Sequence, residues 1–360
     1  MITISGTISK GWMHQTLGVV FDREYYFDPA KRHAIDGRCN EYAATEFPDM
    51  GLFYSESNLG RLRYWNSDQV LIGGIQPNMI LGMLLGADFV PSAGRDADIT
   101  PGCLAGKDLS ELPPPEALLR RELVRSFDCQ IARVRSETGV SLRAIPPFFW
   151  DASGRAAIHG VLTSAQKLCG ETLFLDMLTD PERCLRIMQW IADAYVVLCR
   201  HFSRLAELPI TDVHVGECSC CMVSPALVEQ FVIPLTSRIG RALGPIRLHS
   251  CAASTHLLET FAQIDRLDSL DLGGETSIRK ARDVFGPDMP ISIAPLPRDM
   301  SADNTEPILA WARQTLRDNA GGTLEYVYHL ERSYNIETIR ALTDHVRQQQ
   351  DFEPPRSRYG

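Results

Sequence analysis

The chain has 360 residues, of which 44% are hydrophobic and 22% are charged. These fractions are typical of folded globular proteins and exclude a disordered or fibrous chain, and the length suits one large domain or two smaller ones. The formal net charge is −9 and there is no long run of Lys or Arg, which argues against nucleic acid or an anionic membrane as the partner. We therefore expect a small-molecule substrate.

Targeting signals and cysteine usage indicate the compartment. The N-terminal segment lacks the charged region followed by an apolar region that defines a secretory signal. The longest apolar stretches, such as residues 79–85, are much shorter than the roughly 20 residues of a membrane helix. Ten cysteines in a chain of this length are too few for a disulfide-dense secreted scaffold. We expect a cytoplasmic protein with reduced thiols.

The first 110 residues differ in character from the rest of the chain. They hold several polar and aromatic segments that are typical of loops, and two candidate strands at 51–56 and 69–75. Such a segment suits an N-terminal extension that folds over the mouth of a larger domain. A proline-rich stretch at 112–115 then leads into a predicted helix that ends near Glu137.

From about residue 142, short apolar runs alternate with long amphipathic patterns, which is typical of βα units and a parallel sheet. Two helices have clear start signals, because a capping side chain precedes Pro181 and Pro225. The first should run through Leu205, and Pro234 should kink the second. The strands predicted here are 142–149, 210–217, 246–251, 267–272, 291–296 and 323–329.

Together with the two upstream strands, these segments make eight candidate strands with helices between most of them. This pattern favours an α/β fold of the (βα)8 TIM-barrel type over an open sheet. No Gly-x-Gly-x-x-Gly or Walker loop follows any of them. We expect a single domain over residues 1–350, in which 1–110 form the extension and first strands and 140–345 form the barrel core, and a tail at 351–360.

Chemistry-bearing residues cluster at the ends of three predicted strands, where barrel enzymes place their active sites. In an extended segment His249 and Cys251 point the same way, and an imidazole with a thiolate suits zinc, with iron or cobalt as alternatives. Because a catalytic zinc ion takes three protein ligands, Glu217 and His329 are the natural further ligands. The alternative interpretation is a polar strand end with a buried thiol.

Other polar residues near strand ends are candidates for catalysis or substrate contact. Asp271, Glu217 and His329 could act as catalytic groups. Arg247 points to the same face as His249, where it could meet an anionic substrate or pair with an acid. The predicted substrate-binding residues are Glu56, Asn58, Gln76, Asn78 and Arg247.

Three cysteines follow the predicted strand 210–217. A zinc ribbon would need a second cysteine pair at suitable spacing, and none follows, so a separate structural zinc site is not expected. One member of the cluster could still line the pocket. The three residues are Cys218, Cys220 and Cys221.

The region from about residue 146 to 342 resembles the uroporphyrinogen decarboxylase superfamily, including its cobalamin-dependent methyltransferase branch. The helix starts near 146–148, 173–182 and 223–234 look like those of the superfamily, and Leu-His-Ser-Cys at 248–251 resembles the His-x-Cys zinc motif of methylcobamide:thiol methyltransferases. The resemblance implies a (βα)8 barrel in which His249 and Cys251 bind zinc. In that family zinc activates a thiol, which accepts a methyl group from a methylated corrinoid.

The sequence departs from the family pattern at one ligand. Typical members supply a second cysteine near the last strand, whereas no cysteine follows Cys251 here, so His329 or Glu331 would take that place. The arginine-rich N-terminal motif of the decarboxylases proper has no good counterpart in this sequence.

The leading hypothesis is a metal-dependent methyltransferase or demethylase. A corrinoid protein is the candidate methyl donor. A homodimer would be an ordinary assembly for such a protein.

Two other functions stay open at this point. One is a cofactor-free decarboxylase or lyase that acts on a small carboxylated substrate, with His249, His329 and Asp271 as general acid and base. The other is a non-catalytic metal- or tetrapyrrole-binding protein, in which a closed coordination sphere leaves no place for a substrate.

Overall fold

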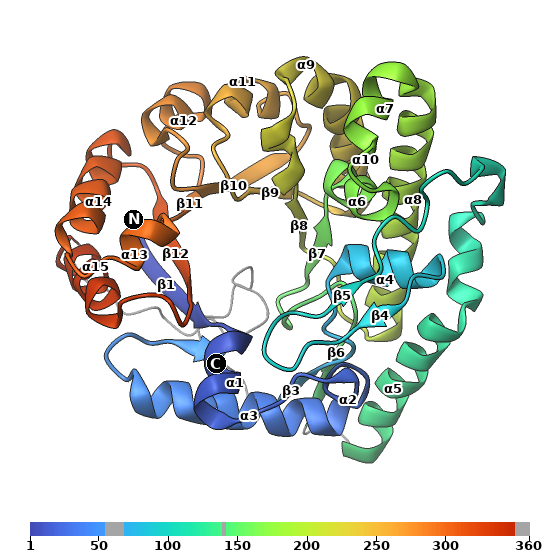
Figure 1. Ribbon diagram of the computed structural model, residues 1–360, viewed down its shortest axis with the longest axis horizontal. Helices are drawn as coiled ribbons and strands as arrows, with labels where there is room; N and C mark the ends of the chain where they lie inside the picture. The colour runs from blue at the N-terminus through green and yellow to red at the C-terminus, as the bar shows by residue number, and fades with distance from the viewer. Residues whose placement is uncertain (55–67, 139–141, 350–360) are drawn as a thin grey trace.

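The computed structural model describes residues 1–54, 68–138 and 142–349. Its main feature is a sheet of eight parallel strands that curls around a central axis, with helices on the outside (Figure 1). The strand order is β2-β1-β12-β11-β10-β9-β8-β7. This arrangement is of the TIM-barrel type, which confirms the predicted α/β fold class.

The strands of the main sheet are largely buried, as expected when helices cover the outer face and side chains fill the inside. Two further strands, β3 (Gln69–Leu71) and β6 (Arg143–Ile145), pair with each other, and within the described residues neither pairs with another strand. Antiparallel β4 (Phe89–Val90) and β5 (Asp98–Ile99) form a third, two-stranded sheet. The main sheet consists of β1 (Ile2–Ile8), β2 (Phe53–Tyr54), β7 (Arg155–His159), β8 (Asp212–Gly216), β9 (Ile246–Ser250), β10 (Leu267–Gly273), β11 (Ile291–Ala294) and β12 (Leu324–Leu330).

Two strands of the main sheet are absent from the sequence prediction. β1 pairs along its whole length with β12, although its position at the start of the chain grouped it with the expected extension. β7 reads Arg-Ala-Ala-Ile-His, and no strand signal marks this segment, because alanine has little strand propensity. The segments predicted at 69–75 and 142–149 form only the short pair β3 and β6, outside the main sheet.

The predicted helix starts are confirmed in detail. α8 (Pro181–Leu205) begins at its proline, and the Asp180 side chain accepts a hydrogen bond from the Arg183 amide. α9 (Pro225–Leu227) is capped by Ser224, and a π-helical turn at Val228–Val232 separates it from α10 (Ile233–Leu243). Pro234 lies in the first turn of α10, so the predicted irregularity takes the form of a π-turn.

The remaining helices surround the sheet. Within the described ranges, no helix combines the length and apolar character needed to cross a membrane. The helices are α1 (Lys10–Leu17), α2 (Arg23–Phe27), α3 (Pro29–Glu46), α4 (Pro77–Leu84), α5 (Glu122–Thr138), α6 (Val161–Cys169), α7 (Leu173–Thr179), α11 (Leu258–Phe261), α12 (Ile278–Phe285), α13 (Pro297–Met300), α14 (Glu306–Asp318) and α15 (Ile336–Gln348).

Candidate functional site

A cavity of about 470 Å³ lies at the carboxyl ends of the strands. It is lined by Ile8 of β1, His159 of β7, Gly216 of β8, His249 of β9 and His329 of β12, each the last or next-to-last residue of its strand. Because the parallel strands all end on the same side of the ring, the fold gathers these side chains from distant parts of the chain. The volume is typical of sites for small molecules.

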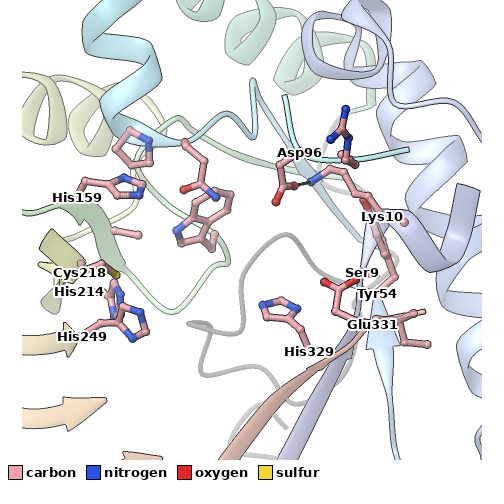
Figure 2. Close-up of a pocket in the computed structure, with 18 of the residues that line it drawn as sticks. Ser9, Lys10, Tyr54, Asp96, His159, His214, Cys218, His249, His329 and Glu331 are labelled. Atoms are coloured by element: carbon pink, nitrogen blue, oxygen red, sulfur yellow. Dashed lines mark hydrogen bonds and ion pairs between the residues drawn. The ribbon is translucent and has the colours of Figure 1, made fainter. Parts of the chain in front are cut away.

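The cavity has two sides with different chemistry (Figure 2). One side carries imidazoles and a thiol, and the other carries an ion pair, a further acid and one more imidazole. The residues of the first side are His159, His214, Cys218 and His249, and those of the second are Ser9, Lys10, Asp96, His329 and Glu331.

Cys218, His249 and Cys251 form a group of potential metal donors whose ligand atoms all lie within 4.8 Å of one another. Cys218 begins the short helical turn after β8, and Cys251 directly follows β9, so neighbouring strands supply the two thiols. Cys218 and His249 are partly buried, and Cys251 is exposed. Two thiolates and one imidazole suit zinc, and three protein ligands leave its fourth position open. The donor set therefore fits a catalytic zinc ion.

The register of the sheet places a carboxylate behind His249. Asp271 of β10 lies beside His249 in the parallel ladder, and Gly216 of β8 lies on the other side of it. His249 Nδ1 and Asp271 Oδ2 are 2.8 Å apart. A carboxylate at Nδ1 fixes the orientation of the ring and leaves Nε2 as the nitrogen that can bind a metal.

Arg247 links this pair to the barrel interior. Its guanidinium donates to Asp271 at 2.8 Å and to Ser292 Oγ at 3.1 Å, and its Nη1 lies 2.8 Å from His214 Nδ1. Arg247, Asp271 and His214 are all buried. His214, His249 and Asp271 are also close enough together to form a metal site, but the fixed positive charge of Arg247 disfavours a cation there.

Burial and neighbouring charges set the proton states of the group. Burial acts to lower the pKa of His249, but the nearby Asp271 and Cys251 outweigh it and raise the pKa to about 9. Burial acts to raise the pKa of Asp271, but Arg247 and His249 hold it well below its usual range. Hydrogen bonds from Cys218 and His249 lower the pKa of Cys251. The interactions among these side chains alone therefore favour the thiolate form of Cys251 and the thiol form of Cys218, whereas a bound metal ion would hold both as thiolates.

Glu217 caps a helix and does not join the donor group. Its buried carboxylate accepts hydrogen bonds from the Leu162 amide at 3.2 Å and from the Thr163 amide and hydroxyl at 3.1 Å, at the start of α6. Burial raises its pKa to about 7 in spite of these bonds. Gly160 makes room for the carboxylate, since a Cβ there would lie 1.9 Å from Glu217 Cδ.

His329 lies across the cavity from His249 (Figure 2). Its Nδ1 is 2.6 Å from Thr7 Oγ1, because β1 and β12 pair Thr7 with His329. Burial lowers the pKa of His329 to about 4, so its ring is neutral at pH 7. Glu331 lines the same side, and burial raises the pKa of its carboxyl. Neither residue is part of the Cys218, His249 and Cys251 group.

The structure places the predicted substrate-binding residues in different environments. Gln76 lines the cavity. Asn78 is buried in α4 and is not among the lining residues. Arg247 is buried, does not line the cavity and pairs with an acid, Asp271, which is one of its two predicted roles. Glu56 and Asn58 lie outside the described residues.

Sequence reasoning did not assign a role to several residues of the cavity. Cys218 belongs to the cysteine cluster that the sequence left without a defined function, although it lies two residues after the end of β8, and Cys251 lies one residue after the end of β9. His159 ends a strand that was not predicted. Lys10 and Asp96 form an ion pair of 2.7 Å between segments far apart in the sequence, which no local pattern indicates.

Comparisons with known proteins find similarity at the level of structure. No family model and no curated protein matches the sequence. A methyltransferase from Methanosarcina mazei has a TM-score of 0.64 and 14% identity, over 96% of this chain and 94% of that chain. A B12-independent methionine synthase from Shewanella sp. W3-18-1, in complex with selenomethionine, has a TM-score of 0.49 and 9% identity, over 97% and 98% of the two chains. The first likeness establishes a shared fold.

Proposed function

We propose that the protein is a zinc-dependent methyltransferase or demethylase of the uroporphyrinogen decarboxylase superfamily. The observation that carries the proposal is the group formed by Cys218, His249 and Cys251, because its donors suit zinc and leave one position open. The His-x-Cys motif and the fold shared with the Methanosarcina mazei methyltransferase support it.

In this proposal Cys218, His249 and Cys251 hold the ion, and Asp271 fixes the orientation of His249 through their 2.8 Å contact. Bound there, zinc would lower the pKa of a substrate thiol and keep it as a nucleophilic thiolate at neutral pH. Arg247 keeps Asp271 ionised, so the carboxylate stays available to His249. The cavity admits a small molecule beside the group, because Cys218 and His249 both line it.

Cys218 takes the place that the sequence hypothesis gave to Glu217 or His329. The oxygens of Glu217 are occupied by the start of α6, and His329 contacts Thr7 on the other side of the cavity. A second thiolate also makes the site softer, which favours zinc over metals that prefer oxygen ligands.

Elemental analysis of the purified protein tests the ligand set. We expect about one zinc ion per chain in the unmodified protein, as one donor group predicts, and loss of the zinc in His249→Ala, Cys251→Ser and Cys218→Ser. Cys221→Ser is the matched control, because Cys221 is a neighbouring thiol outside the donor group. Iron or cobalt in place of zinc would contradict the choice of metal. A metal-free protein would contradict the proposal and favour the decarboxylase or lyase.

Methyl transfer itself can be followed with methylcobalamin and 2-mercaptoethanol as probes. Transfer of the methyl group to the thiol yields a thioether, cob(I)alamin and a proton, and the visible spectrum of the corrinoid reports the change. We expect turnover that requires His249 and persists in Cys221→Ser. A zinc-loaded protein without turnover on any thiol and methyl-corrinoid would favour the binding-protein alternative.

A further inference from the structure

The proposed function leaves His214 without a role, although it borders the donor group. His214 lies on β8, and its ring is buried apart from the part that lines the cavity. The ring centroids of His214 and His249 are 5.6 Å apart, and Figure 2 shows the two rings next to Cys218. His214 therefore lines the same part of the cavity as the donor group.

Arg247 fixes the position of the proton on the His214 ring. Arg247 Nη1 lies 2.8 Å from His214 Nδ1, and a guanidinium group can only donate hydrogen bonds. Nδ1 must therefore be the acceptor, so the ring is neutral and its one N–H proton is on Nε2. Burial and the charge of Arg247 also hold the pKa of His214 well below its ordinary value, which agrees with a neutral ring.

The Nε2–H group of His214 is available to the cavity. Nε2 has no hydrogen-bond partner within the described residues, and protein atoms do not enclose it. Residues two apart on a strand share a face, so Gly216 follows His214 on the same face of β8, towards the carboxyl end. A Cβ at Gly216 would be 4.0 Å from the rings of His159 and His249. The missing side chain of Gly216 therefore leaves a gap between these two rings, through which a ligand reaches the N–H of His214.

A neutral N–H donor at this place suits one kind of ligand atom. It stabilises an acceptor, most of all one with negative charge, and it offers nothing to an ammonium ion. In the proposed function the ligand atom beside the donor group is the sulfur of a thiolate, which is such an acceptor. Because the ring is not an imidazolium, it can stabilise the thiolate without protonating it.

We propose that His214 Nε2–H donates a hydrogen bond to the sulfur of the thiol acceptor and so holds it beside Cys218, His249 and Cys251. The identification of the acceptor atom as sulfur rests on the proposed function, whereas the position of the proton on His214 does not. The hydrogen bond favours the thiolate over the thioether product, because a neutral sulfur is a weak acceptor. Arg247 acts through His214 as a positioning residue, since it sets the tautomer.

The tautomer is tested by NMR of protein labelled with ¹⁵N at its histidines, with the metal present and after its removal by a chelator. The protonated and the bare nitrogen of a neutral imidazole have well separated ¹⁵N shifts, and long-range ¹H-¹⁵N spectra assign each to its ring position. His214→Asn identifies the signals of His214. We expect a bare Nδ1 and a protonated Nε2 at neutral pH. A proton on Nδ1, or on both nitrogens, would overturn the proposal.

Two substitutions separate the roles of the two ring nitrogens. In His214→Asn the new amide oxygen can take the place of Nδ1 and accept from Arg247, but nothing replaces the N–H that lines the cavity. In His214→Gln the new amide nitrogen can take the place of Nε2 and donate to a ligand in the cavity. Both variants should keep their zinc, because neither changes a member of the donor group.

Isothermal titration calorimetry of the zinc-loaded protein measures the affinity for 2-mercaptoethanol and for its methyl thioether. We expect His214→Asn to raise the Kd of the thiol roughly ten- to 100-fold, the effect of one hydrogen bond to a charged group, and to change that of the thioether little. His214→Gln should recover most of the lost affinity. An unchanged Kd of the thiol in His214→Asn would overturn the proposal, as would equal losses for the thiol and the thioether.

These measurements also separate the role of His214 from the proposed function. If the unmodified protein holds no zinc, the proposed function fails, and with it the sulfur as acceptor, whereas the tautomer of His214 is decided by its NMR signals alone. If the three donors bind zinc but His214→Asn binds the thiol as tightly as the unmodified protein does, the role of His214 fails and the metal centre stands.

Discussion

Asp271 is the residue on which the orientation of the donor group depends. It contacts His249 and Arg247 at 2.8 Å each, and it is buried. Asp271→Asn keeps an acceptor but removes the charge, so we expect zinc affinity to fall roughly 10- to 100-fold, the usual effect of losing a carboxylate behind a metal-binding histidine. Competition with a chromophoric chelator measures the affinity. Asp265→Asn, at an exposed acid paired with Arg241, should leave the affinity unchanged.

Glu217 gives the stability of the protein a defined pH dependence. Its pKa is about 7 in the folded protein, against 4.5 as the ordinary value, so the folded state holds a proton that the unfolded state has lost between these pH values. The free energy of unfolding therefore falls as pH rises through this window, by on the order of 3 kcal/mol.

The Glu217→Gln variant isolates this contribution. We expect the free energy of unfolding of the unmodified protein, relative to the variant, to decline between pH 4.5 and 7, as followed by urea denaturation. Glu337→Gln changes an exposed acid beside Arg340 and should show no such trend. If the free energies of unfolding of the unmodified protein and of Glu217→Gln differ by a constant amount across this pH range, the pKa of Glu217 is not raised.

At this scale the sequence predicted part of the site. His249 and Cys251 were identified because their spacing puts both side chains on one face at a strand end. The position of Glu217 was not predictable, since it depends on the room left by Gly160 and on the free amides at the start of α6. Cys218 was not selected, because the geometry of the turn after β8 decides which of the clustered cysteines approaches His249.

At the scale of elements, the contact between the residues that follow β7 and those that follow β8 depends on a glycine. Gly160 lets the Glu217 carboxylate reach the first turn of α6, and an added Cβ would lie 1.9 Å from it. We expect Gly160→Ala to lower the free energy of unfolding by ~1–3 kcal/mol, as for other overpacked sites. Gly216→Ala is the matched control, because the nearest atom to its Cβ would be 3.8 Å away. Equal stability of the two variants in urea denaturation would contradict this role of Gly160.

Local signals predicted some elements better than others. The starts of α8 and α9 were predicted because a capping side chain and a proline act within one turn. The membership of β1 and β7 in the main sheet was not predicted, because it depends on pairing with β12 and β8, far along the chain. The short β3 and β6 carry apolar residues like those of the main sheet, yet in the part of the chain that the structure describes they pair with each other and not with that sheet.

At the scale of the whole molecule, the parallel ring determines which residues meet. The helices α9 and α10, the π-helical turn between them and strand β9 all separate Cys218 from Cys251 in sequence, yet β8 and β9 are paired neighbours in the sheet. The cavity likewise joins the end of β1 to the end of β12. The fold class was predictable from the alternation of strands and helices, whereas the third metal donor depends on the pairing of β8 with β9.

Zinc-edge X-ray absorption of the purified protein tests the central claim most directly, because it counts the sulfur and nitrogen ligands of the ion. The account predicts two sulfurs at roughly 2.3 Å and one imidazole nitrogen at roughly 2.0–2.1 Å, with the remaining position held by a light atom from solvent or substrate. Cys218→Ser should reduce the sulfur count to one. If the unmodified protein showed a single sulfur ligand, with oxygen or a second imidazole as the other protein ligand, the assignment of Cys218 would be contradicted. Glu217 or His329 would then be the third ligand.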